Sequence, residues 1–560
     1  NPTTAVITRI TAPTAERPHG HVHVIWKTPD QLRLEVDRAL TALGLPATGD
    51  TTADLATGAR QSRAATAPFA KPHAAFLAAA ARGYAAVQHS LGREEAAGLA
   101  QFASLVADEQ RSCFVAEIMV YIDCPVTRQG ITLVDTPGAD SINARHTDVA
   151  FDYIKNADAI LFVTYYNHAF SRADSDFLTQ LGRVKDSFAL DKMFFVINAA
   201  DLATDAEELD LVASHVRQNL QACGIRQARI FPVSSQTALW RRLQAAGRLP
   251  QELAAKLPRR GPSGMERFEA EFYRFVVTDL SQMAVDGALA ELRRALQTIG
   301  SWLEAAHADD GARAARLQAL RAAEDRALSA LTALDAAPEA AEVAREIDEL
   351  LYYVRRRVLR ERFRDGFTLA FNPSVLRPDS LDLKRALREA LAEVLQFVSF
   401  DLAQEMRATA LRVENVVNRQ AERVQLRAVG GVAQHLPQWS GPVYSPIHLP
   451  VPTFTDAHLS PDQFLKLLGL FRSPERFFAG GGRDELSEQL SQALAEPVSA
   501  YLGAARETLA HWYGDALHHR VEAMQGELIT AVADHGRGLT VALTGAGSSA
   551  QLETILQALQ

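Results

Sequence analysis

A short apolar run ending in a carboxylate is the first feature of this sequence that could do chemistry. Residues 131–138 read Ile-Thr-Leu-Val-Asp-Thr-Pro-Gly. The apolar and β-branched residues predict a buried strand with Asp135 at its end. A carboxylate at that place could hold Mg²⁺ through a water, and Gly138 could bring its N–H close to a γ-phosphate because glycine has no side chain. Ordinary strand ends also show this D-x-x-G pattern, so the assignment depends on further segments.

A second apolar run ends in two polar residues. Residues 194–201 read Phe-Phe-Val-Ile-Asn-Ala-Ala-Asp, which predicts a strand followed by Asn198 and Asp201. An Asp at such a place can accept two hydrogen bonds, from the N1–H and the 2-amino group of guanine. Adenine offers neither donor, so this carboxylate would select guanine over adenine.

Two more segments complete the pattern. Residues 229–235 predict a third strand that ends in Ser234 and Ser235, and their backbone could contact the base from the other side. Residues 1–10 predict a loop that runs into an edge strand. This loop offers Thr3, Thr4 and Thr8 as candidate ligands of a metal ion or of its water.

The amino-acid sequences of these segments resemble those of the dynamin superfamily of large GTPases, most closely the bacterial dynamin-like proteins. The resemblance lies in N-P-T-T-A-V-I-T, D-T-P-G, N-A-A-D and V-S-S-Q-T-A-L-W-R-R-L. It implies GTP or GDP and Mg²⁺ as cofactors, with hydrolysis by water attack. The implied site residues are Thr4 or Thr8 and Asp135 at the metal, Gly138 at the γ-phosphate, and Asn198, Asp201, Ser234 and Ser235 at the base. Ala199 stands where the family usually has a Lys that stacks on the base.

A phosphate-binding loop is the element that this pattern lacks. The motif G-x-x-x-x-G-K-[ST] does not occur in the 560 residues. In the family, this loop lies a few dozen residues before the segment that opens the present chain. We therefore expect a Gly-rich loop ending in Gly-Lys-Ser or Gly-Lys-Thr upstream of Asn1, and no hydrolysis by the present chain alone.

Composition limits the class of protein. The length predicts more than one domain, and 48% hydrophobic with 22% charged residues is ordinary globular composition. A net charge of −9 argues against a nucleic-acid binder. Three scattered cysteines favour a reducing cytoplasm over a disulfide framework.

The first half of the chain alternates strands and helices. Strands are expected at 1–10, 21–26, 116–122, 131–134, 159–164, 192–197 and 228–233, and helix is expected up to about residue 105 after a loop at 45–66. Such alternation predicts a doubly wound α/β domain of the P-loop type, incomplete at its N-terminus, over residues 1–280.

Beyond residue 281 the sequence becomes rich in Ala, Leu, Arg and Glu. Helices are expected at 282–336, 338–366, 380–427 and 484–535, which assigns 281–427 and 484–560 to a helical neck and trunk. The order of these parts resembles a dynamin stalk. A separate helical bundle without mechanical role is the alternative.

A segment without charged residues interrupts the helices. Residues 428–455 contain no Asp, Glu, Lys or Arg, as a membrane-spanning segment would. Five prolines in this stretch exclude a continuous membrane-spanning helix. Residues 428–483 are therefore interpreted as an extended loop and a trunk tip that binds anionic lipid as a peripheral contact. The residues expected at lipid are Phe464, Lys466, Leu467, Leu468, Leu470, Phe471, Arg472, Arg476, Phe477 and Phe478. Packing against the trunk or a partner chain is the alternative.

Residues 352–364 form a strongly basic run, Tyr-Tyr-Val-Arg-Arg-Arg-Val-Leu-Arg-Glu-Arg-Phe-Arg. On a helix these arginines spread over much of the circumference. We expect them to pair with trunk carboxylates, and contact with lipid or nucleic acid is the lesser alternative.

The resemblance implies a membrane function. In dynamins two GTPase domains pair across their nucleotides, and the stalk converts this pairing into tethering, fusion or remodelling. The expected partners are anionic lipids and a second copy or a paired dynamin-like subunit, at the inner face of the plasma membrane. A non-hydrolysing scaffold and a ribosome-associated GTPase are the alternatives, and the acidic charge and long helices disfavour the latter.

Overall fold

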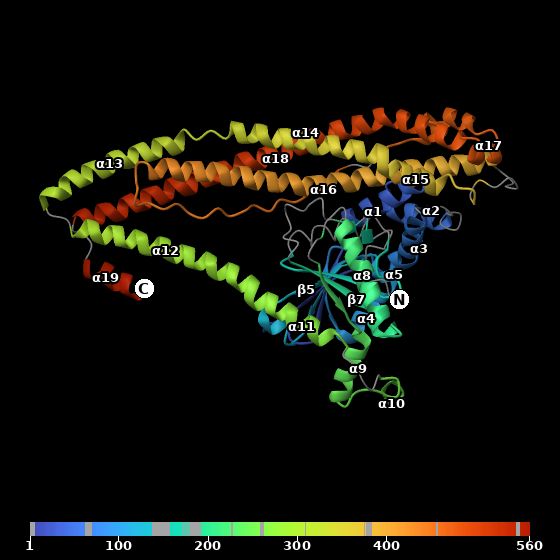
Figure 1. The fold of residues 1–560 in the computed structure, drawn as a ribbon, viewed down its shortest axis with the longest axis horizontal. Helices are drawn as coiled ribbons and strands as arrows, with labels where there is room; N and C mark the ends of the chain where they lie inside the picture. Colours follow the sequence, from blue (N-terminus) through green and yellow to red (C-terminus); the bar gives the residue numbers. More distant parts are fainter. Residues whose placement is uncertain are drawn as a thin grey trace.

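The computed structural model joins an α/β part to a long helical trunk (Figure 1). The α/β part, coloured blue to green, lies beside the trunk near the end that carries α17 (Pro474–Ala479). The structure describes residues 6–61, 70–136, 157–171, 174–175, 177–178, 192–223, 225, 228–257, 263–307, 310–374, 376, 383–454, 457–544 and 549–559.

One sheet of the α/β part is mixed, in the order β3-β2-β4-β1-β5. Its strands are β1 (Ile7–Thr11), β2 (His21–Trp26), β3 (Glu94–Gly98), β4 (Val115–Tyr121) and β5 (Leu133–Asp135). β1 runs parallel to β4, whereas the other pairs are antiparallel. Its helices are α1 (Pro29–Ala42), α2 (Thr51–Gln61), α3 (Ala70–Val87), α4 (Leu99–Ala107) and α5 (Glu109–Ser112). Val22, Val24 and Ile118 are buried in the core that these elements share.

The other sheet is parallel, in the order β6-β7-β8. It contains β6 (Ile160–Tyr165), β7 (Met193–Asn198) and β8 (Arg229–Pro232), with helices α8 (Ala206–Ala222), α9 (Ser235–Ala245), α10 (Gln251–Ala254) and α11 (Met265–Arg274). β7 is buried on both faces. Phe195 and Ile197 share a cluster with α8, while Phe194 and Val196 pack with Phe272 of α11. A continuous apolar run predicts such a central parallel strand.

The structure confirms an α/β domain followed by long helices and corrects two details. Only the β6–β8 sheet is parallel throughout; in the other sheet β1 and β4 are parallel, whereas β2, β3 and β5 pair antiparallel with their neighbours. Residues 94–98, expected to be helical, form the edge strand β3. Pairing with β2 outweighs the helix propensity of Glu94, Ala96 and Ala97, because propensity is a weak preference that tertiary contacts override.

The trunk consists of long helices that lie side by side (Figure 1). They are α12 (Ser281–Ala306), α13 (Asp310–Thr332), α14 (Ala337–Arg357), α15 (Phe363–Ala370), α16 (Leu383–Ala433), α18 (Gly482–Thr544) and α19 (Ser549–Leu559). The π-helical segments η5 (Phe275–Leu280) and η6 (Val358–Arg362) connect α11 to α12 and α14 to α15. α18 has 63 residues, or about 95 Å at 1.5 Å per residue. Within the described ranges, no helix is both long enough and apolar enough to cross a bilayer.

The proline-rich segment after α16 returns along that helix as an extended chain (Figure 1). Asn418 of α16 holds it, because its Oδ1 accepts hydrogen bonds from Tyr444 Oη and from the backbone N–H of Ile447, both at 2.8 Å. Gln425 Nε2 donates to the carbonyl of Pro442 at 2.7 Å, which satisfies a backbone group that a proline-rich chain cannot pair within itself. This segment therefore lines the trunk.

The tip follows the extended segment and leads into α18. It is built from η7 (Pro461–Gln463), η8 (Leu465–Leu470) and α17. Phe477 is 1% exposed, and its ring centroid lies 4.9 Å from that of Phe471 and 6.1 Å from that of Phe371. Phe464 is also buried, at 3% exposed. The expectation of lipid contact is wrong for Phe464 and Phe477 in this conformation, because both rings belong to the trunk core.

Phe477 is consequently expected to be a stability residue. Phe477→Ala should lower the free energy of unfolding by about 3–5 kcal/mol, because it removes a fully buried ring and leaves a cavity. Thermal unfolding followed by circular dichroism measures the loss. Phe478→Ala is the matched control, since Phe478 is only partly buried and should cost less. Equal losses for the two variants would contradict this assignment.

Candidate functional site

The end of β7 is tied to the end of β8 through Asn198. Its Oδ1 accepts hydrogen bonds from the N–H of Ala199 at 2.8 Å and from the N–H of Ser235 at 3.2 Å. Nearby, the N–H of Ala200 donates to the carbonyl of Val233 at 3.0 Å. The two loops therefore lie together at the carboxyl ends of neighbouring parallel strands, where ligands bind in open α/β sheets.

A backbone feature at Ala199 was not foreseen from the sequence. Its φ is +62°, in the left-handed region, and it is the one non-glycine residue with positive φ in the part of the chain that the structure describes. Alanine rarely takes this conformation, so its type carries no signal for such a turn. The turn leads directly into the 3₁₀ helix η4 (Ala200–Leu202), which carries Asp201.

Asp201 is exposed beyond this turn, and no hydrogen bond or ion pair to its carboxylate is found among the described residues. The chain that follows is fixed to α8. Thr204 donates from its hydroxyl to Glu208 at 2.6 Å and from its N–H at 2.9 Å, and the hydroxyl bond lowers the pKa of Glu208. Asp205 caps α8 by accepting the N–H of Glu208 at 2.8 Å. Both oxygens of Asp201 are thus left to accept hydrogen bonds from a ligand.

Ser234 and Ser235 lie beside Asn198, as expected, but Ser234 already has structural bonds. Ser234 is buried and caps α9, accepting the N–H of Thr237 at 3.2 Å, and its own N–H donates to the carbonyl of Ser263 at 2.7 Å. The N–H of Ser235 donates to Asn198. A contact of either serine with a base stays a prediction.

The phosphate and metal half of the site is described only in part. Thr8 and Asp135 are direct partners in the antiparallel pairing of β1 with β5. Asp135 is exposed, whereas Thr8 is 3% exposed and its hydroxyl lies 3.5 Å from the carbonyl of Val6. Thr4 and Gly138 lie outside the described residues, so their predicted roles stay predictions.

Three cations are displayed at the trunk tip. Lys466, Arg472 and Arg476 are exposed, and within the described part of the chain none of them has an ion-pair partner. The apolar side chains beside them are partly buried against the trunk core, namely Leu467, Leu468, Leu470, Phe471 and Phe478. Contact of these residues with lipid stays a prediction.

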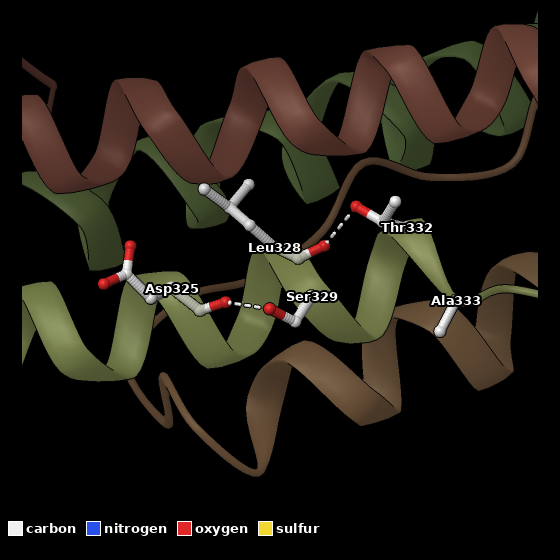
Figure 2. Close-up of a pocket in the computed structure, with 5 residues that line it drawn as sticks. All are labelled: Asp325, Leu328, Ser329, Thr332 and Ala333. Carbon is white, nitrogen blue, oxygen red and sulfur yellow. Dashed lines mark hydrogen bonds between the residues drawn. The ribbon is translucent and has the colours of Figure 1, made fainter.

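An open hollow of about 600 Å³ lies on α13, far along the chain from these residues (Figure 2). Asp325, Leu328, Ser329, Thr332 and Ala333 line it. Ser329 donates its hydroxyl to the carbonyl of Asp325 at 2.7 Å, and Thr332 donates to that of Leu328 at 2.8 Å. The hydroxyls are therefore satisfied by their own helix, and the hollow offers no convergent polar groups for a ligand.

Comparisons with known proteins agree with this geometry. Residues 1–200 match the model of the Dynamin family. Dynamin-like protein A of Bacillus subtilis (strain 168) is 28% identical over 540 residues, which is 95% of this chain and 43% of that protein. A probable transmembrane GTPase, FZO-like and chloroplastic, of Arabidopsis thaliana is 27% identical over 26% of this chain and 16% of its own length. The chain thus spans less than half the length of these curated relatives.

Solved structures give a weaker likeness. A structure of an oligomerised bacterial dynamin pair matches all of this chain and 72% of its own, with a TM-score of 0.40 and 16% identity. This level of similarity carries no argument about assembly.

The fold and the family match define the class of protein that this chain is similar to: residues 1–200 match the Dynamin family model, and the α/β part has a dynamin-type GTPase fold. Over most of its length the chain is similar to Dynamin-like protein A, a bacterial dynamin-like protein. The resemblance predicted from the motifs is confirmed.

The Asn198 bonds give a direct test of the site. Asn198→Ala should lower the free energy of unfolding by about 1–3 kcal/mol, because two backbone N–H groups lose their acceptor. Thermal unfolding measures this loss. Asn198→Asp keeps the acceptor oxygen and should lose less. Asn219→Ala is the matched control, because it removes only a side-chain bond to the carbonyl of His215 in its own helix. An unchanged unfolding midpoint for Asn198→Ala would show that the two loops are held by other contacts.

Proposed function

We propose that this chain is part of a dynamin-like GTPase that couples guanine-nucleotide binding and hydrolysis to membrane tethering, fusion or remodelling. The observation that carries the proposal is the exposed carboxylate of Asp201, which has no hydrogen bond or ion pair within the described part of the chain and is held on a turn that Asn198 fixes. In this position it can accept both donors of a guanine base. The family match of residues 1–200 supports the same class of ligand.

The donor set fits a hard cation at the end of β5. Asp135 is an exposed carboxylate, and Thr8 is its partner on β1. Carboxylate and hydroxyl oxygens suit Mg²⁺. We propose that Asp135 holds the ion through water, with Thr4 before Thr8 as the threonine ligand and with Gly138 at the γ-phosphate. The bound ion would neutralise phosphate charge during water attack.

The sheet edges support the addition of a phosphate-loop strand. Among the described residues, β5 ends the mixed sheet and β6 ends the parallel sheet. Val163 and Tyr165 of β6 are 60% and 48% exposed, which is unusual for apolar residues of a parallel strand. We propose that a strand leading into a Gly-rich phosphate loop pairs with these edges, and that GTPase domains of two subunits pair across their nucleotides.

The trunk tip is the proposed membrane contact, on the inner face of the plasma membrane. Lys466, Arg472 and Arg476 would attract anionic headgroups, and the partly buried leucines beside them would enter the interface. A non-hydrolysing scaffold with the same tip is the second candidate. Nucleotide turnover by the complete protein separates the two.

Nucleotide specificity tests the site. In the complete protein, Asp201→Ala should reduce the preference for GTP over ATP by roughly 2–4 kcal/mol, because the charge-assisted hydrogen bonds to guanine are lost. Competition between labelled GDP and unlabelled GTP or ATP measures the preference. Asp210→Ala, a nearby exposed carboxylate on α8, is the control and should leave it unchanged. Equal affinity of the unmutated protein for GTP and ATP would refute the assignment of Asp201.

Liposome flotation tests the tip. Reversing Lys466, Arg472 and Arg476 to Glu should abolish flotation with phosphatidylserine vesicles, since each basic residue near such a surface contributes about 1 kcal/mol. All three side chains are exposed, so the unfolding midpoint should not change. The control reverses Arg316, Arg321 and Arg326, exposed on α13. If the tip variant floats like the unmutated protein, the membrane contact lies elsewhere.

A further inference from the structure

The turn that begins α11 is in direct contact with the loop after β8. The backbone N–H of Ser234 donates to the carbonyl of Ser263 at 2.7 Å, and both serines are buried. Gly264 comes next and has a φ of +75°, in the left-handed region. A β-carbon added to Gly264 would lie only 2.1 Å from the carbonyl oxygen of Pro232. Glycine is therefore required at this position both for its φ and for the close approach of the two backbones.

The backbone that Gly264 approaches is bonded to the loop of Asp201. The N–H of Val233, which follows Pro232, donates to the carbonyl of Ile197 at 2.9 Å. The carbonyl of Val233 accepts the N–H of Ala200 at 3.0 Å, and Ala200 directly precedes Asp201. A displacement of the β8 loop would therefore reach the carboxylate of Asp201 through a single hydrogen bond.

Aromatic side chains hold α11 against the sheet. The ring centroid of Phe272 lies 5.5 Å from that of Phe194 in β7, and the ring centroid of Phe268 lies 5.6 Å from that of Phe231 in β8. Moving α11 away from the sheet would separate these rings, which carry large apolar areas. A group added at residue 264 should therefore displace the β8 loop more readily than the helix.

The hydroxyl of Ser263 fixes the same turn. It donates to Glu266 at 2.7 Å and accepts the N–H of Met265 at 3.2 Å. The hydrogen bond from Ser263 holds the pKa of Glu266 below its ordinary value. These bonds orient the residue whose carbonyl accepts the N–H of Ser234.

We propose that Gly264 and Ser263 are positioning residues of the guanine-nucleotide site. They hold the β8 loop, and through Ala200 they hold Asp201, at the place where its carboxylate can receive a guanine base. This inference rests on the proposed guanine-nucleotide function and adds two residues that act through others. Because a β-carbon does not approach an oxygen closer than about 3 Å, a methyl group at residue 264 would displace the loop by roughly 1 Å.

Two glycine variants of the complete protein test the proposal. Gly264→Ala and Gly247→Ala both place alanine at a positive φ, +75° and +66°, so both acquire backbone strain. At Gly247, beyond the end of α9, no atom of the described residues lies within 4 Å of an added β-carbon. Gly247→Ala is therefore the matched control for strain without displacement of the loop.

The measurement is the release of fluorescently labelled GDP into an excess of unlabelled GDP. Only folded protein carries the label, so a loss of stability does not change the rate. Gly264→Ala should release GDP at least about tenfold faster than the unmutated protein, because a misplacement of 1 Å can cost a binding site more than this. Its preference for GTP over ATP should fall as well, since Asp201 is displaced. Gly247→Ala should stay within about twofold of the unmutated rate.

A second pair of variants tests the turn without changing its backbone. Glu266→Ala removes the acceptor of the Ser263 hydroxyl, whereas Glu266→Gln keeps an acceptor oxygen. Glu266→Ala should release GDP roughly threefold faster, and Glu266→Gln should release it close to the unmutated rate. This pair decides the question if Gly264→Ala does not fold.

The inference is overturned if folded Gly264→Ala and Gly247→Ala release GDP at the same rate. Where Gly264→Ala does not fold, equal release by Glu266→Ala and Glu266→Gln overturns it. If the unmutated protein binds no GDP, the proposed function fails and this inference fails with it. If the unmutated protein binds GDP with guanine specificity and the paired variants do not differ, this inference alone is refuted.

Discussion

A continuous apolar seam along α18 is the constraint on which the trunk depends. Its buried side chains run from Leu486 to Val532, and most successive members are four residues apart. Because an α-helix has 3.6 residues per turn, such a seam winds slowly around the helix. α18 can therefore pack against α14, α16 and α13 along its length. Each buried leucine contributes about 1.5–3 kcal/mol, so sliding one helix along another would be costly, and the packing sets the position of the tip along the trunk.

Buried charges add specificity to this seam. Glu405 and Asp401 of α16 are each 3% exposed. Burying these two carboxylates would be strongly unfavourable without their ion pairs to Arg357 and Arg362. Since a shifted helix would leave a buried charge unpaired, the two pairs favour one alignment of α14 and η6 on α16. Arg356, Arg360 and Arg364, from the same basic run at residues 352–364, are exposed, so this basic run has members both inside the trunk and on its surface.

The α/β part is joined to the trunk by packing. One apolar cluster contains Ile197 of β7, Val216 and Leu220 of α8, and Ala408 and Leu411 of α16. Ile197 directly precedes Asn198, so the candidate nucleotide loop begins at the end of a strand whose core reaches the trunk. Gln396 of α16 also donates to the carbonyl of Ala42 at 2.7 Å. A ligand at the β7 loop would thus bind at the end of a strand whose side chains share an apolar cluster with α16.

Local patterns in the sequence determined many of the strands and helices of this protein and the position of its candidate nucleotide loop. Apolar runs ending in polar residues located β7, β8 and the loop of Asn198 and Asp201. Helical periodicity located α16 and α18 and their starts within three residues, but it ended them six and nine residues too early. Tertiary contacts decided the rest. β3 forms because it can pair with β2. The left-handed turn at Ala199 could not be predicted, because alanine rarely adopts a positive φ. Phe477 is buried because Phe371, about a hundred residues earlier in the chain, packs on its ring. Aromatic, leucine and basic residues in one segment suit a lipid surface and a protein interior equally well, and only the position of distant segments selects between them.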